Sequence, residues 1–183
     1  TGCSAATWSG SDTLVEQGAG VGGTASISGT FVATDVDNGD SLHYRLVDTG
    51  KGVHETLYLV KDGAGGIKLV STPGNNGDAD YYGKVSIDQN GKYTVELFNK
   101  SAAVQELKGD GSTDKPFTFT VAAQDSKGAY VAQEVTGNIK GTNDAPEIAW
   151  NSIHLREEGV WNNGLWNNSN DETKKKKKND GGF

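Results

Sequence analysis

Glycine, asparagine and aspartate divide this chain into short runs that alternate apolar and polar residues. In the clearest case, two such runs in residues 84–98 flank Gln89-Asn90-Gly91. An Asn-Gly pair between alternating runs is a strong β-hairpin signal, because both residues tolerate the positive φ angles of a tight turn. Residues 55–71 and 116–139 show the same arrangement around Gly-containing loops. The sequence therefore predicts a series of antiparallel hairpins.

Helical periodicity is nearly absent, and only residues 101–107 could form a short helical turn. Many short strands without a helical pattern are typical of an antiparallel β-sandwich, which is the predicted all-β fold class. The apolar residues of the alternating runs should supply much of the core. They are Phe31, Leu42, Tyr44, Leu46, Val85, Ile87, Tyr93, Val95, Leu97, Phe117, Phe119 and Val121.

Charge and composition narrow the function classes. The chain has 183 residues and a formal net charge of −7, which argues against general nucleic-acid binding. The single cysteine, Cys3, cannot form a disulfide within the chain. Apolar runs of 18 or more residues are absent from the sequence, so we expect no membrane insertion.

The segment Gly141-Thr142-Asn143-Asp144-Ala145-Pro146 indicates a strand exit followed by a stiff connector. Gly141 frees the backbone, and Pro146 restricts it. Between them, Asn143 and Asp144 present oxygen-bearing side chains, which suit a hard cation such as calcium.

Several segments, taken in chain order, carry a resemblance to a known family. They are Gly29-Thr30-Phe31 with residues 35–40, then residues 82–94, 102–107, 117–128 and 141–146. Together they resemble the VCBS repeats, the cadherin-like tandem domains of large bacterial RTX-type adhesins. The resemblance implies a Greek-key sandwich of cadherin or immunoglobulin type. It also implies a secreted, non-enzymatic, calcium-dependent repeat that stiffens a cell-surface fibre for adhesion or biofilm formation, with neighbouring repeats as partners.

The resemblance suggests three parts. Residues 1–13 would be a leader or preceding linker, 14–148 the sandwich, and 149–183 a linker, the start of a next repeat and a Lys-rich tail. Leu14-Val15-Glu16-Gln17-Gly18 is echoed by Leu155-Arg156-Glu157-Glu158-Gly159, at an offset of 155 − 14 = 141 residues. That offset suits a whole domain, so residue 155 onward is interpreted as the first strand of another repeat.

A cadherin-like strand order would gather carboxylates at the two ends of the sandwich. One end would collect Glu16, Asp35, Asp37 and Asp125, and the other would offer Asn143, Asp144 and Glu157 to a following domain. Calcium takes six to eight oxygen ligands, so each site would be shared between neighbouring repeats. The alternative is that these aspartates only form turns and face solvent.

Two other functions stay open at this stage. Trp161 and Trp166 lie in a Trp-Asn repeat and could stack on sugar rings, as in a carbohydrate-binding module that recognises polysaccharide. Alternatively, the strand after Ile153 could complete the sheet of a neighbouring fibre subunit.

Residues 18–23 match a dinucleotide-binding glycine pattern, but a Thr/Ser/Ile run follows where a helix is required. No Ser-His-Asp or Cys-His grouping is readable either, and the resemblance implies no catalysis, so we expect no enzyme.

Overall fold

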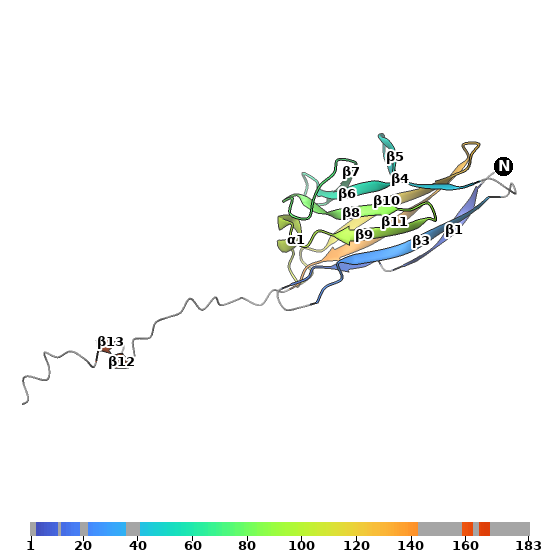
Figure 1. Cartoon of the computed structure of the whole chain (residues 1–183). Coiled ribbons are helices and arrows are strands. Elements are labelled where there is room, and N and C mark those ends of the chain that lie inside the picture. The colour runs from blue at the N-terminus through green and yellow to red at the C-terminus, as the bar shows by residue number, and fades with distance from the viewer. Residues whose placement is uncertain are drawn as a thin grey trace, which may run out of the picture. The chain divides into compact units, whose positions relative to one another are not determined.

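The computed structural model describes residues 3–10, 12–18, 22–35, 41–142, 159–162 and 165–168. Residues 3–10, 35, 159–162 and 165–168 are described by their backbone. The chain divides into two compact units, Thr1–Ala145 and Pro146–Phe183. The first unit is a β-sandwich, as the alternating sequence runs predict (Figure 1). The predicted Greek-key connectivity stays a prediction.

One sheet of the sandwich has six strands, and every pairing in it is antiparallel. From edge to edge its strands are β1 (Cys3–Gly10), β3 (Ser26–Asp35), β9 (Lys92–Leu97), β8 (Tyr81–Ile87), β6 (Thr56–Lys61) and β7 (Ile67–Val70). Residues 1–13 were expected to be a leader or linker, and this expectation is wrong for residues 3–10, which form β1 along the edge of β3. Backbone pairing along that edge does not require the apolar alternation by which the other strands were found.

The second sheet has five strands. In spatial order they are β2 (Thr13–Val15), β11 (Tyr130–Lys140), β10 (Lys115–Gln124), β4 (His43–Asp48) and β5 (Gly52–His54). Strand β2 pairs with β11 in parallel, whereas the other neighbours are antiparallel. The predicted helical turn is confirmed as α1 (Ala102–Gln105), where the Ser101 hydroxyl caps the helix by accepting a hydrogen bond from the backbone N–H of Ala103.

The core lies between the two sheets and consists largely of the predicted residues. All of them are buried except Leu42, which is half-buried and packs against the cluster. Aromatic pairs connect the sheets: the rings of Tyr93 on β9 and Phe119 on β10 lie 5.2 Å apart between centroids in an edge-to-face arrangement. Burial of these side chains is the main source of stability, since the described residues form no disulfide and only a four-residue helix.

Three hairpins use the same turn, which begins with aspartate and has glycine three residues later. The glycines, Gly65, Gly91 and Gly128, have φ angles of 87°, 79° and 91°. The turns begin at Asp62, Asp88 and Asp125, and in each the Oδ1 atom accepts two backbone N–H groups of its own loop. This is the three-residue hairpin with a left-handed glycine, and it explains why these loops could be found from sequence.

The second unit contains a two-stranded antiparallel sheet, β12 (Gly159–Asn162) with β13 (Leu165–Asn168). In its register Trp161 stands opposite Trp166. Residues 155–158, on which the proposed internal repeat depends, lie outside the described part of the chain, so that repeat stays a prediction.

Candidate functional site

Strand directions define two poles of the sandwich. The amino-terminal pole contains the start of β1, the end of β3, the start of β4 and the β10–β11 turn; the carboxyl-terminal pole contains the end of β11, the end of β2 and α1. Figure 1 shows the start of β1 and α1 at opposite ends of the sandwich. The start of β1 and the end of β11 therefore lie at opposite poles.

The predicted ligand residues do not all gather at one pole. Asp35 ends β3 and Asp125 begins the β10–β11 turn, so both lie at the amino-terminal pole. Glu16 lies at the carboxyl-terminal pole, where its backbone N–H donates to the carbonyl of Lys140 at 2.9 Å. The 11 residues of β11 separate it from Asp125 by about 35 Å.

The expectation that Glu16 converges with Asp35 and Asp125 is therefore wrong. Its cause is the direction of β2: because β2 runs parallel to β11, its last residues reach the pole where β11 ends. Glu16 is thereby placed beside Thr142, two residues before Asp144 in the sequence.

Glu16 is the most deeply buried carboxylate at this pole, with 1% of the residue exposed. Its Oε1 accepts a hydrogen bond from Nε2 of Gln105 at 2.9 Å, and its Oε2 accepts one from the backbone N–H of Thr142 at 3.2 Å. Nε2 of Gln105 also donates to the carbonyl of Asn99 at 2.7 Å. One carboxylate thus links three segments: the end of β2, the α1 region and the chain leaving β11.

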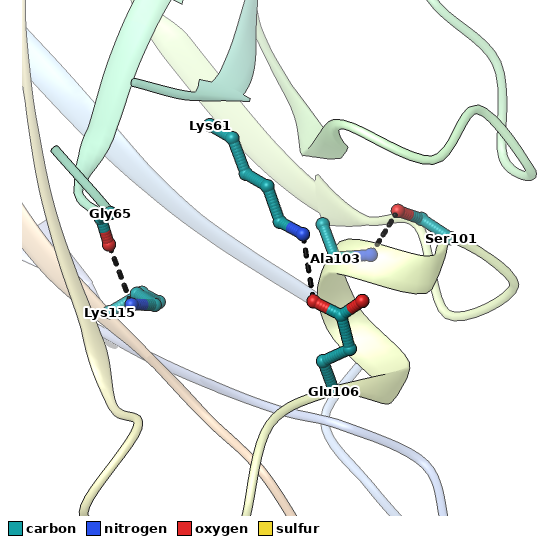
Figure 2. Close-up of polar contacts among 6 residues, drawn as sticks. All are labelled: Lys61, Gly65, Ser101, Ala103, Glu106 and Lys115. Atoms are coloured by element: carbon teal, nitrogen blue, oxygen red, sulfur yellow. Dashed lines mark hydrogen bonds and ion pairs between the residues drawn. The ribbon is translucent and has the colours of Figure 1, made fainter. Parts of the chain in front are cut away.

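Further contacts close this pole around α1. Nζ of Lys61 forms an ion pair with Oε2 of Glu106 at 2.8 Å, and Lys115 donates to the carbonyl of Gly65 at 2.6 Å (Figure 2). The hydrogen bond from Lys61 to Glu106 raises the pKa of the lysine, although partial burial opposes the shift. These contacts hold the end of β6 and the β6–β7 loop against the carboxyl end of α1 and the start of β10.

A cavity of about 480 Å³ lies at the same pole, lined by residues 105–110 and Thr142. The Thr142 hydroxyl oxygen is buried and has no hydrogen-bond partner among the described residues. Gly141 packs so closely on Leu107 that a Cβ there would lie 2.5 Å from the Leu107 carbonyl carbon. The exit of the chain is therefore fixed by packing and by a buried carboxylate.

Asp125 has a defined local role. Only 7% of the residue is exposed, and its Oδ1 accepts the backbone N–H groups of Lys127 and Ala129 at 2.9 and 2.8 Å. Asp62 and Asp88 cap their turns in the same way, which favours turn formation as the reason for an aspartate at this position. A calcium role for Asp125 stays a prediction.

The structure describes the remaining predicted ligand and sugar-binding residues only in part. Asp37, Asn143, Asp144 and Glu157 lie outside the described residues, and Asp35, Trp161 and Trp166 are described by their backbone alone. Within the described ranges, no group of three or more His, Cys, Asp or Glu side chains is close enough to hold a metal ion.

Gln105 and Thr142 were not found from the sequence. They lie 89 and 126 residues from Glu16, and neither belongs to a motif that would connect them. The sequence predicted a helical turn at residues 101–107, which contains Gln105, but nothing in it placed that turn beside Glu16.

No protein-family model matches this sequence, and a search of curated proteins found no match. In the part of the chain that the structure describes, no helix is long and apolar enough to cross a membrane.

Proposed function

We propose that this chain is a non-catalytic link in an extended bacterial cell-surface fibre, an adhesin or biofilm-matrix protein built from tandem β-sandwiches and braced by calcium. The observation that supports the proposal is the placement of β1 and of the end of β11 at opposite poles of the sandwich. Cys3 starts β1 at the amino-terminal pole, and Thr142 leaves the domain at the opposite pole. Tandem domains with this geometry extend the fibre by the full length of each sandwich.

The direction of β2 supports a mechanical role. A pull on both ends moves β1 and β2 toward one pole and β11 toward the other. The parallel pairing of Thr13–Val15 with Asn138–Lys140 is then loaded along the strands. Hydrogen bonds that run across the strands resist such shear together, whereas a pull perpendicular to a strand opens them one after another. The buried bonds of Glu16 add resistance at the same place.

Calcium is the cation that the available side chains suit, because carboxylate and amide oxygens are its preferred ligands. Asp35 and Asp37, with Asn143 and Asp144 from the connector of a preceding repeat, would hold it. Glu16 fits the role of positioning the connector, since both of its oxygens already accept hydrogen bonds from the protein. When bound, calcium would neutralise carboxylates that otherwise repel across a domain boundary.

The calcium part is tested by thermal unfolding of two EDTA-treated copies of this chain joined in tandem, during titration with calcium, because the proposed ligands come from consecutive repeats. We expect the melting temperature to rise at roughly 0.1–1 mM calcium, the range of extracellular modules, and to respond little to magnesium. Asp35→Ala combined with Asp37→Ala should abolish the rise. Asp88→Ala, which removes only a turn cap, should lower the melting temperature but leave the response intact. An unchanged melting temperature would reject calcium bracing by this chain.

The mechanical part is tested separately by single-molecule stretching. Handles at the native Cys3 and at Lys140→Cys pull along the sandwich, whereas handles at Cys3 and Gln124→Cys both lie at the amino-terminal pole. We expect a clearly higher unfolding force in the first geometry. Equal forces in the two geometries would contradict the proposed role as a load-bearing link.

A further inference from the structure

A groove of about 660 Å³ crosses the outer face of the five-stranded sheet, between the β4–β5 hairpin and the β10–β11 turn. Sites for small ligands commonly have volumes of about 300–1,000 Å³ and combine apolar surface with a few polar groups. Its lining includes His43, Arg45, Val53, Ala122, Gln124 and Tyr130.

The strand register arranges these side chains in rows. Gln124 on β10 pairs with His43 on β4 and with Tyr130 on β11, so the three form one row across neighbouring strands. In the next row, Ala122 pairs with Arg45. Cross-strand partners project from the same face of a sheet, so the small Ala122 leaves a depression between longer side chains.

Exposed apolar surface flanks this depression. Tyr130 is 71% exposed and Val53 is 55% exposed, and both are among the few large apolar residues exposed in the described part of the chain. The buried aromatic rings of this domain pack in the core between the sheets, whereas the ring of Tyr130 lies outside it. Core packing therefore does not explain an exposed tyrosine beside this groove. An exposed aromatic ring with polar neighbours suits a ligand that has both apolar and hydrogen-bonding surfaces.

The charge of the groove differs from that of the chain. The whole chain has a net charge of −7, yet the basic side chains His43, which is exposed, and Arg45, which is half-buried, both line the groove. Asp48 also lines it but is 93% buried, at 7% exposure. Charge complementarity therefore favours an anionic ligand.

We propose that this groove binds an acidic oligosaccharide, a glycan that contains uronate. The ring of Tyr130 would stack on the apolar face of a pyranose, while His43 and Gln124 would hydrogen-bond its hydroxyl groups. The guanidinium of Arg45 would bind the uronate carboxylate, since its planar donors match a carboxylate. The groove adjoins the amino-terminal pole at the row of His43, Gln124 and Tyr130, but its lining includes none of the predicted calcium ligands.

Arg45 is already held in a suitable position. Its Nη1 donates to the carbonyl of Tyr44 at 2.8 Å, and its Nη2 lies 3.4 Å from Oε1 of Glu55. The Glu55 side chain is 66% exposed, and exposed ion pairs of this kind contribute little to stability. A ligand carboxylate can therefore replace Glu55 at the guanidinium.

Isothermal titration calorimetry of the full chain with tetragalacturonate tests the proposal. The buffer contains EDTA, so calcium cannot bridge protein and ligand, and failure of this proposal is distinguishable from failure of the calcium proposal. We expect binding in the millimolar range or tighter, with little binding of the neutral maltotetraose or of tetraglutamate. Tyr130→Ala and Arg45→Gln should each weaken binding by about tenfold, the cost of losing one central contact.

Control variants separate the contacts from general effects. Tyr130→Phe keeps the ring and should retain affinity, and Arg45→Lys keeps the charge without the planar fork and should still weaken binding. Lys68→Gln changes the net charge equally at an exposed position on β7 and should have no effect. Absence of binding, equal affinity for tetraglutamate or maltotetraose, or full affinity in folded Arg45→Gln protein would each overturn the proposal.

Discussion

Replacement of Glu16 by alanine should destabilise the sandwich by about 3 kcal/mol. Hydrogen bonds to a charged group contribute about 1.5–3 kcal/mol each, and the substitution removes those from Gln105 and Thr142. We use the lower end of this range, because Thr142 is half-buried and water can reach part of it. Glu16→Gln keeps the shape but loses the charge and one acceptor, so it should cost about 1 kcal/mol.

Urea unfolding at pH 7 in EDTA, followed by circular dichroism, measures this effect. With an m-value of about 1–3 kcal/mol per M, the midpoint of Glu16→Ala should fall by at least about 1 M. A double-mutant cycle with Gln105→Ala should give a coupling energy of about 1–2 kcal/mol, because the two side chains are bonded directly. Glu134→Ala, at an exposed position on β11, serves as the control and should change stability by less than about 0.5 kcal/mol.

A loss below about 1 kcal/mol in Glu16→Ala, or a coupling energy near zero, would refute this reasoning. Either result would mean that the bonds of Glu16 are replaced by water at no net cost. Hydrogen exchange adds a local readout, since the amide of Thr142 should lose protection in Glu16→Ala while amides in the middle of β11 keep theirs.

Three further predictions use the same urea assay. Gly91→Ala should lower the free energy of unfolding by at least about 3 kcal/mol, because φ is positive at Gly91 and a Cβ there would overlap the carbonyl oxygen of Phe31. Gly65 has a similar φ but open space around it, so Gly65→Ala should cost only about 1–2 kcal/mol. Ser101→Ala should cost about 1 kcal/mol through loss of the helix cap. Burial raises the pKa of Tyr93 to about 12, above roughly 10 in the unfolded chain. Stability should therefore fall by roughly 2–3 kcal/mol between about pH 10 and pH 12, and Tyr93→Phe should remove that loss.

The hairpins could be predicted because their information is local. In each, an aspartate oxygen caps its own loop and a glycine three residues later adopts a positive φ. The same locality applies to α1, where Ser101 precedes the helix that it caps. The core followed from the alternation, since side chains separated by two positions share a face of the sheet.

The position of Glu16 could not be predicted, because it depends on the pairing of strands far apart in the sequence. The direction of a short strand such as β2 is set by β11, more than 120 residues later. No residue within β2 distinguishes parallel from antiparallel pairing. Strand β1 was missed for a related reason, since its contribution is a pairing along the edge of β3.

The acidic residues of this domain therefore have separable roles. Asp62, Asp88 and Asp125 shape turns through local bonds, so loss of any one should affect its hairpin first. Glu16 instead joins segments distant in the sequence, at the place where a pull on the chain would reach β11. A buried carboxylate with protein donors on both oxygens resists displacement with or without metal. The chain exit up to Thr142 is thus held by the sandwich itself, and under the proposed function calcium would add stiffness only to the residues that follow.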